Sequence, residues 1–349
     1  LTSLGLTNTP AEYFQLWRNG EQVRLYTSVA TGPFGANDYI EFWGKSNDGI
    51  PDKNLYLKQG YQLCDSFSLH SDTAAYFLTV NPFAGNLRYT NTANNVAFNT
   101  LPQENYFMRT VAKAFKQQYN RGYAVQVGEM VYSSSYDISE GWTSNDIGAG
   151  DPFAMYHQFD DMNVYQAGPA NSVSFAIAAG GNALNTRRIK IRFFNNVVDS
   201  VSVNYFDTLK RTFNNLPLSL LQNPNYLQVS IANNSNNPFD RIVVANMAVT
   251  YPATFNFSGQ KNFPFQLGPS SQGNYLVIDN FSHGTSVPVL YSLNDGRRYA
   301  GDLNEPGKVR FVLPASLDAV RKFVLVSEEA TNITNVTSAT TRQFINFTH

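Results

Sequence analysis

Residues 173–194 read VSFAIAAGGNALNTRRIKIRFF, and this stretch decides the fold class. It contains two apolar runs, 173–178 and 188–194, that have the length of single strands, and Asn185 and Thr186 lie between them. Short apolar or alternating runs bounded by turn residues are typical of β-strands, in which successive side chains point to opposite faces of a sheet. The stretch therefore predicts two consecutive strands.

Runs of the same kind recur along the chain and are separated by turn residues such as those at 233–238 and 295–296. Many short strands with turns between them predict an all-β fold, built mainly from antiparallel β-sandwich or jelly-roll domains. The further runs lie at 22–29, 38–43, 74–80, 227–231, 241–251, 274–278, 287–293, 308–313 and 322–326.

One or two short helices are expected in this β-rich chain. In 105–119, Phe107, Val111 and Phe115 recur at four-residue spacing, which is the pattern of one buried helix face. A second, shorter helix is expected at 216–221, between two asparagines and Pro224.

Chain length and polar interruptions give the expected domain organisation. A length of 349 residues favours two or three domains over one large core. Polar, Asn- and Gly-rich stretches at 88–99 and 258–261 predict an N-terminal β-sandwich-like domain over 1–100 and a jelly-roll-like β domain over 101–257, with the helix near 105–119. A small C-terminal β domain is expected over 258–349, ending in a linker-like tail.

Composition excludes several classes of protein. The 25 Lys+Arg against 26 Asp+Glu leave a net charge of −1 without a basic stripe, so neither nucleic acid nor an anionic membrane surface is an expected partner. Apolar runs are too short for a membrane span of roughly 18–20 residues. Abundant Asn, Ser, Thr, Tyr and Phe are typical of β-rich extracytoplasmic proteins, in the periplasm, on the outer-membrane surface or secreted. Because the chain begins at Leu1 without a leader, we expect it to be a piece of a longer protein.

Catalytic motifs are absent from the sequence. The four histidines are isolated from one another and lack the spacing of a zinc site. Cys64, the only cysteine, has no Gly-rich shoulder that could supply oxyanion donors, so we interpret it as structural. There is no GxSxG, GxGxxG or Walker loop. We therefore expect no enzyme activity from this chain and no cofactor.

Two acidic groups are candidate sites. Asp48 and Asp52 flank a glycine turn and could contribute carboxylate oxygens to a structural Ca²⁺, although an ordinary Asn-Asp-Gly turn explains the pattern as well. The second group combines aromatic rings with acids, as in a sugar-binding cleft or a glycosidase pair, although a solvated acidic loop beside a packed tryptophan is more common. Its members are Tyr136, Asp137, Glu140, Trp142, Asp146 and Asp151.

A family resemblance comes from residues 13–90. This region contains FQLWRNGEQVRLYTS (14–28), GPFGANDYIEFWGKSNDGIPDKNLY (32–56), SLHSDTAAYFLTV (68–80) and GNLRY (85–89). Weaker features follow at Glu140-Gly141-Trp142, at FDRIVV (239–244) and at TYP (250–252). Together they resemble the N-terminal region of the gingipain-like peptidases of family C25, which include the PorU-type sortases of type IX secretion in Bacteroidetes.

The resemblance implies an exported, non-catalytic, β-rich region that positions or covers a peptidase domain or mediates assembly at the outer membrane. In such proteins the catalytic Cys and His belong to an α/β domain that follows these β domains, so no catalytic residue is carried over to this chain. The implied partner is the parent protein's own C-terminal peptidase domain, or type IX secretion components. The alternative is a carbohydrate-binding or cell-adhesion module whose site is the aromatic and acidic group of the middle domain.

Overall fold

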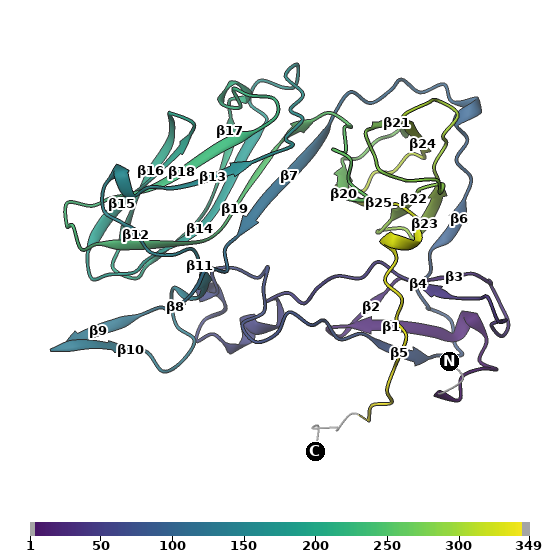
Figure 1. The fold of residues 1–349 in the computed structure, drawn as a ribbon, viewed down its shortest axis with the longest axis horizontal. Helices are drawn as coiled ribbons and strands as arrows, with labels where there is room; N and C mark the ends of the chain where they lie inside the picture. The colour runs from purple at the N-terminus through teal and green to yellow at the C-terminus, as the bar shows by residue number, and fades with distance from the viewer. Residues whose placement is uncertain (1–3, 344–349) are drawn as a thin grey trace. The chain divides into compact units, whose positions relative to one another are not determined.

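The computed structural model describes residues 4–343, which form two compact units of strands and short helices (Figure 1). Within that range, the first unit comprises residues 4–45, 75–104 and 257–343, and the second comprises 46–74 and 105–256. The boundaries predicted near 101 and 257 lie close to the ends of the second unit's longer segment. The division into three domains stays a prediction.

The core of the second unit is an antiparallel sandwich of two sheets. One sheet has the order β7-β19-β14-β17, with the short β12 also pairing with β19, and the other has the order β13-β18-β15-β16. Eight strands in these two orders form a jelly roll, so the predicted all-β, mainly antiparallel fold class is confirmed. The strands are β7 (Phe107–Ala114), β12 (Ile147–Gly148), β13 (Met155–Phe159), β14 (Val173–Gly181), β15 (Thr186–Phe193), β16 (Asn196–Asn204), β17 (Thr208–Leu216), β18 (Leu227–Asn234) and β19 (Arg241–Ala253).

Alternation within the strands builds the sandwich core. In β15, Ile189, Ile191 and Phe193 are fully buried, whereas the basic residues between them face outward. Phe193 meets Phe175 of the opposite sheet with ring centroids 5.3 Å apart at 88°. The two runs of the 173–194 stretch therefore supply β14 and β15, one strand to each sheet.

The helix predicted at 105–119 is wrong. Residues Phe107–Ala114 form β7, which pairs with β19 residue by residue from Phe107 opposite Ala253 to Ala114 opposite Asn246. Burial alternates along the strand, because Phe107 and Val111 face inward while Met108 and Thr110 are exposed. Pairing with a buried central strand has overridden the local helical spacing.

One long, interrupted hairpin extends the second unit, with one strand pair at its base and another at its tip. β8 (Gln118–Arg121) pairs with β11 (Glu140–Thr143), and β9 (Ala124–Val127) pairs with β10 (Glu129–Tyr132). Figure 1 shows β9 and β10 extending away from the sandwich. The helices of the described chain are 3₁₀ turns of three to five residues, and the one at Leu218–Leu220 lies within the predicted 216–221. They are η2 (Ala11–Tyr13), η3 (Pro51–Leu55), η4 (Gln59–Tyr61), η5 (Val96–Phe98), η6 (Asp151–Phe153), η7 (Leu218–Leu220) and η8 (Ala330–Asn332).

The first unit combines strands from both ends of the chain. β1 (Phe14–Arg18) lies between β2 (Glu21–Val23) and β5 (Phe77–Val80), and β3 (Tyr26–Thr27) pairs with β4 (Ile40–Glu41). β6 (Thr90–Thr92) pairs in parallel with β23 of a C-terminal sheet of order β20-β25-β22-β23-β6. The remaining strands are β20 (Asn262–Leu267), β21 (Asn274–Asp279), β22 (Val289–Ser292), β23 (Arg297–Ala300), β24 (Lys308–Leu313) and β25 (Arg321–Val326), with β21 paired to β24.

Candidate functional site

Trp142 lies on the β8–β11 hairpin of the second unit, directly opposite Tyr119. Their rings meet edge to face, with centroids 5.5 Å apart at 87°. The Lys116 ammonium lies 5.2 Å above the Trp142 ring and 5.5 Å above the Phe67 ring, and it pairs with Asp72 at 2.7 Å. The indole Nε1 is buried and has no hydrogen-bond partner among the described residues. Neighbours from its own unit therefore occupy much of the tryptophan's surface.

The Glu140 side chain acts as a hydrogen-bond acceptor within this hairpin. Its Oε1 accepts from the Tyr119 hydroxyl and its Oε2 accepts from the Asp137 N–H, both at 3.0 Å. Burial, together with the hydrogen bond to Glu140, raises the pKa of Tyr119 well above its ordinary range. Both carboxylate oxygens of Glu140 are thus engaged in fixing the hairpin base.

Tyr136 and Asp137 lie in the segment that leads into β11. The Tyr136 ring packs 5.7 Å from Tyr56, and its hydroxyl lies 3.4 Å from His70 Nε2. Asp137 Oδ1 accepts a 2.7 Å hydrogen bond from the Ile138 N–H. The structure therefore brings together four of the predicted residues, Tyr136, Asp137, Glu140 and Trp142, around one hairpin.

Asp146 and Asp151 are held by other partners. Asp146 Oδ1 accepts from Gln118 and Asn182, and its Oδ2 lies 3.4 Å from Arg241. Asp151 pairs with Arg192 at 2.8 Å, and this hydrogen-bonded guanidinium lowers the pKa of the carboxyl. Each of these acids has donors within its own unit, and the glycosidase pair stays a prediction. The carbohydrate site stays a prediction.

The two acids of the predicted calcium turn face backbone donors. Asp48 Oδ1 accepts from the Ile50 N–H at 3.2 Å, and the buried Asp52 accepts from the Leu69 N–H at 2.6 Å. Within residues 4–343, no cluster of three or more His, Cys, Asp and Glu side chains is placed to hold a metal ion. The structural Ca²⁺ stays a prediction.

Cys64, His157 and His283 have different neighbours. Cys64 is partly buried against Leu63, Ala178 and Ala245, and its Sγ accepts from the Ser66 N–H at 3.4 Å. His157 packs against the rings of Phe115 and Phe159, whereas His283 contacts the Ser286 carbonyl. His349 lies outside the described residues. No helix of the described chain is long and apolar enough to cross a membrane.

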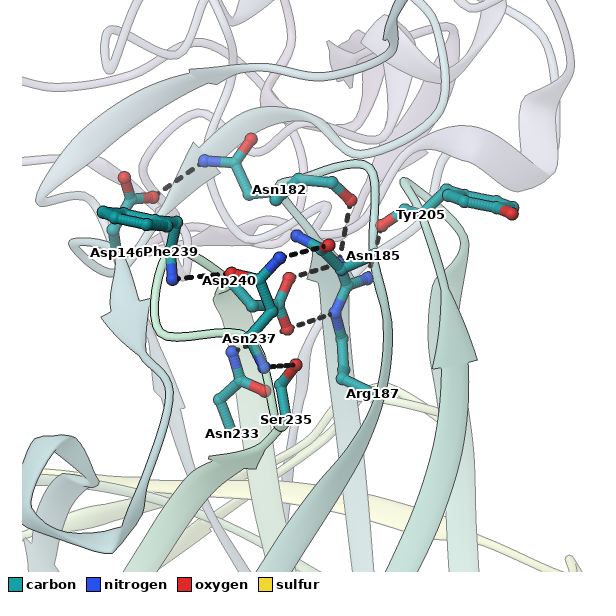
Figure 2. A network of polar contacts seen from close by, with 11 residues as sticks. Asp146, Asn182, Asn185, Arg187, Tyr205, Asn233, Ser235, Asn237, Phe239 and Asp240 are labelled. Carbon is teal, nitrogen blue, oxygen red and sulfur yellow. Dashed lines mark hydrogen bonds and ion pairs between the residues drawn. The ribbon is translucent and has the colours of Figure 1, made fainter.

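Figure 2 shows a polar network that the sequence analysis missed, at one end of the sandwich. Arg187 and Asp240 form a fully buried ion pair, with Nη2–Oδ1 at 2.6 Å and Nε–Oδ2 at 2.8 Å. Arg187 also donates to the Ala183 and Tyr205 carbonyls, and Asn233 donates to Asp240 at 3.0 Å. Although burial alone would raise it, the hydrogen bonds from Arg187 and Asn233 keep the pKa of Asp240 below its ordinary value.

A sequence signal for this network did exist. Arg187 precedes Ile189 and Ile191 at two-residue spacing, so alternation places its side chain on the buried face of β15. A charge at such a position requires a partner of opposite sign, because an unpaired buried charge is strongly unfavourable. The alternation could not indicate which of the distant acids would be that partner.

Comparison with solved structures shows a likeness in fold to PorU. The latent, dimeric PorU of Porphyromonas gingivalis matches with a TM-score of 0.52 and 10% identity, over 93% of this chain and 30% of the PorU chain. The chain therefore has a PorU-like fold and spans less than a third of PorU's length. No protein-family model matches the sequence, and no curated protein sequence matches it.

Two carbohydrate-binding modules are more distant. One is the CBM36-1 domain of a multidomain xylanase from the hindgut metagenome of Trinervitermes trinervoides, with 8% identity, and the other is a CBM36 module in complex with calcium and xylotriose, with 11% identity. Each covers 40% of this chain and nearly all of the module, 96% and 97%, with a TM-score of 0.25. A score this low does not establish a shared fold.

Proposed function

We propose that the chain is a non-catalytic, β-rich accessory or scaffold region of an exported gingipain-like cysteine peptidase or type IX secretion sortase-like protein. The observation that carries the proposal is the PorU-like fold, which extends over 93% of this chain and only 30% of PorU. In this proposal the catalytic domain lies beyond residue 349 in the parent protein, and this region positions or covers it. The region itself needs no cofactor, and its location is extracytoplasmic.

The residues behind the sequence resemblance support a scaffold role. The Asn47 N–H donates to the Asp72 carbonyl, and Asp72 in turn pairs with Lys116 of the sandwich segment. A Cβ on Gly49 would lie 2.3 Å from the Phe67 carbonyl oxygen, so only glycine fits there without a shift. These motif residues hold segment 46–74 in place, as expected of a structural region.

The proposal is tested by separating the chain from the downstream part of its parent protein. The parent reading frame is sequenced on both sides, the segment beyond residue 349 is expressed alone, and thiol-dependent hydrolysis of a peptide panel is measured with and without this chain. We expect the chain alone to be inactive, a Cys64→Ala variant to be indistinguishable from it, and the downstream segment to change its rate when the chain is added. Hydrolysis by the chain that Cys64→Ala abolishes, or a frame that stops near His349, refutes the proposal.

A further inference from the structure

The first unit contains a cavity of about 580 Å³ that neither the sequence motifs nor the fold comparison assigns to a function. It lies between the residues that lead into β1, strand β3, the loop 82–86 and the beginning of β6. This volume falls within the range of about 300–1,000 Å³ that is usual for sites of small ligands. Room for a ligand is therefore present within one unit.

Two side chains fix the walls of this cavity. Asn86 uses its whole amide: Oδ1 accepts from Gln15 and Asn81, and Nδ2 donates to the Glu12 and Asn81 carbonyls. Arg88 donates to the Ala11, Phe14 and Leu87 carbonyls at 2.7–3.1 Å. Four of these seven hydrogen bonds join Asn86 and Arg88 to residues 11–15 at the start of β1. A cavity with fixed walls requires little ordering when a ligand binds.

Four of the lining residues are aromatic: Tyr13, Tyr26, Phe83 and Tyr89. Tyr89 is buried against Tyr291, and the Arg298 guanidinium covers one face of Tyr26, so Phe83 and the partly buried Tyr13 supply the most accessible rings. Phe83 lies in the loop 82–86 with 77% of its surface exposed, so its ring is accessible to a ligand. Rings of this kind provide flat apolar faces with hydroxyl groups at their rims. They suit a ligand that itself has one apolar face and several hydrogen-bonding groups.

The charges of the lining oppose each other. Glu12 offers a carboxylate whose Oε2 accepts from the Gly32 N–H, and Arg88 offers a guanidinium on the same lining without a direct ion pair to Glu12 in the described chain. Burial lowers the pKa of Arg88, and the charge of Glu12 acts in the opposite direction, so the two groups sense each other. Each of these charges attracts the ion that the other repels, so the lining has no net preference for a cation or an anion. A ligand without net charge fits this balance.

From the ring faces, the fixed walls and the cancelled charges, we propose that this cavity binds a neutral oligosaccharide. The C–H face of a pyranose ring would pack on the aromatic side chains, and its hydroxyl groups would donate to Glu12 and exchange hydrogen bonds with the Tyr13 hydroxyl. This site is separate from the Trp142 hairpin of the second unit and is independent of the proposed accessory role.

The test uses the whole chain and defined sugars. Saturation-transfer NMR and calorimetry are run with neutral xylo-, cello- and manno-oligosaccharides and with an anionic oligouronate. Phe83→Ala removes the exposed ring and leaves the Asn86 side chain that holds the loop unchanged. Tyr13→Phe keeps the ring but removes its hydroxyl. The matched control is Phe98→Ala, because Phe98 lies in the same unit outside the cavity and is 86% exposed. Trp142→Phe distinguishes the site from the second unit's hairpin.

We expect at least one neutral oligosaccharide to bind, with affinity lowered tenfold or more by Phe83→Ala and a few-fold by Tyr13→Phe. Phe98→Ala and Trp142→Phe should leave the affinity unchanged, and circular dichroism should show all four variants folded. Absence of binding by every neutral sugar, preference for the oligouronate, or loss of binding in Trp142→Phe with retention in Phe83→Ala overturns the proposal.

Discussion

Replacing Glu41 with glutamine is expected to stabilise the first unit above pH 7 and to leave its stability unchanged near pH 4.5. Glu41 is the second residue of β4 and is partly buried. Loss of hydration on burial, with the nearby Glu328 carboxylate acting in the same direction, raises the pKa of Glu41 from 4.5 to about 7, although Arg298 opposes the shift. Arg298 already pairs with Glu328 at 3.5 Å, so a single guanidinium serves two carboxylates.

The sign of the effect is set by the direction of this shift. Between about pH 4.5 and 7 the folded chain holds a proton on Glu41 that the unfolded chain has released, so stability falls as pH rises through this window. Each pKa unit corresponds to about 1.4 kcal/mol, which gives an upper limit of about 3.4 kcal/mol for the shift. Because water still reaches part of the side chain, we expect about 1–2 kcal/mol. Glutamine keeps the shape of the neutral acid and cannot ionise.

The three tryptophans make the first unit separately observable. Trp17 and Trp43 belong to the first unit and Trp142 to the second, so urea unfolding followed by fluorescence in a Trp142→Phe background reports on the first unit. Native, Glu41→Gln and Glu21→Gln chains are compared from pH 4.5 to 8.5, with the exposed Glu21 of β2 as the matched control. A Glu41→Gln effect that is the same at every pH, or that lowers stability at pH 8, would refute the reasoning.

Three further predictions concern the second unit and are tested by urea unfolding. Asp240→Asn should lower the free energy of unfolding by about 3–5 kcal/mol, because it leaves the buried Arg187 without its counter-charge. The double variant Arg187→Met with Asp240→Leu should recover most of that loss. A loss below about 1 kcal/mol for Asp240→Asn would contradict the buried pair. Lys116→Met keeps the aliphatic stem but loses the charge over Trp142 and Phe67 and the ion pair with Asp72, so we expect a loss of about 0.5–1 kcal/mol and faster proteolysis within 46–74. Unchanged proteolysis of this segment would contradict the prediction. Val127 at the end of β9 is 72% exposed, so Val127→Lys should change the free energy of unfolding by no more than about 0.5 kcal/mol and raise solubility at high concentration. A larger loss of stability would show that this face of the hairpin is packed.

The local sequence pattern was sufficient to predict the fold class, but it was not sufficient to predict that β7 is a strand. In β14 and β15, apolar runs and alternation coincide with turn residues, so neighbouring residues alone indicate strands. In 105–119, the same residues fit a helical face and a strand face, since Phe107 and Val111 satisfy both spacings. The strand is selected by β19, whose Ala253 lies opposite Phe107 although more than a hundred residues separate them. A choice made by so distant a partner is not encoded in a local window.

Tyr136, Asp137, Glu140 and Trp142 lie near one another in the structure because they are close in the sequence, and their role as a binding site stays a prediction. The donors that engage Glu140, Asp146 and Asp151 come partly from distant strands, such as Arg192 of β15 and Arg241 of β19. Acidic side chains were therefore recognisable in the sequence, whereas their pairing depended on the tertiary fold.

The motif residues that suggested a family also explain why motif similarity says little about the chemistry of this chain. Gly141 has φ +129, and a Cβ there would lie 3.0 Å from the Tyr56 hydroxyl, so glycine is required by the backbone and by its neighbour. Asp240 belongs to a fully buried ion pair, and Gly49 packs against the backbone at Phe67. Backbone conformation, a buried ion pair and close packing within the chain account for these three residue types without a substrate or partner. A related chain could retain all of them while binding something different, so the functional question rests on direct measurements at Cys64, Phe83 and Trp142.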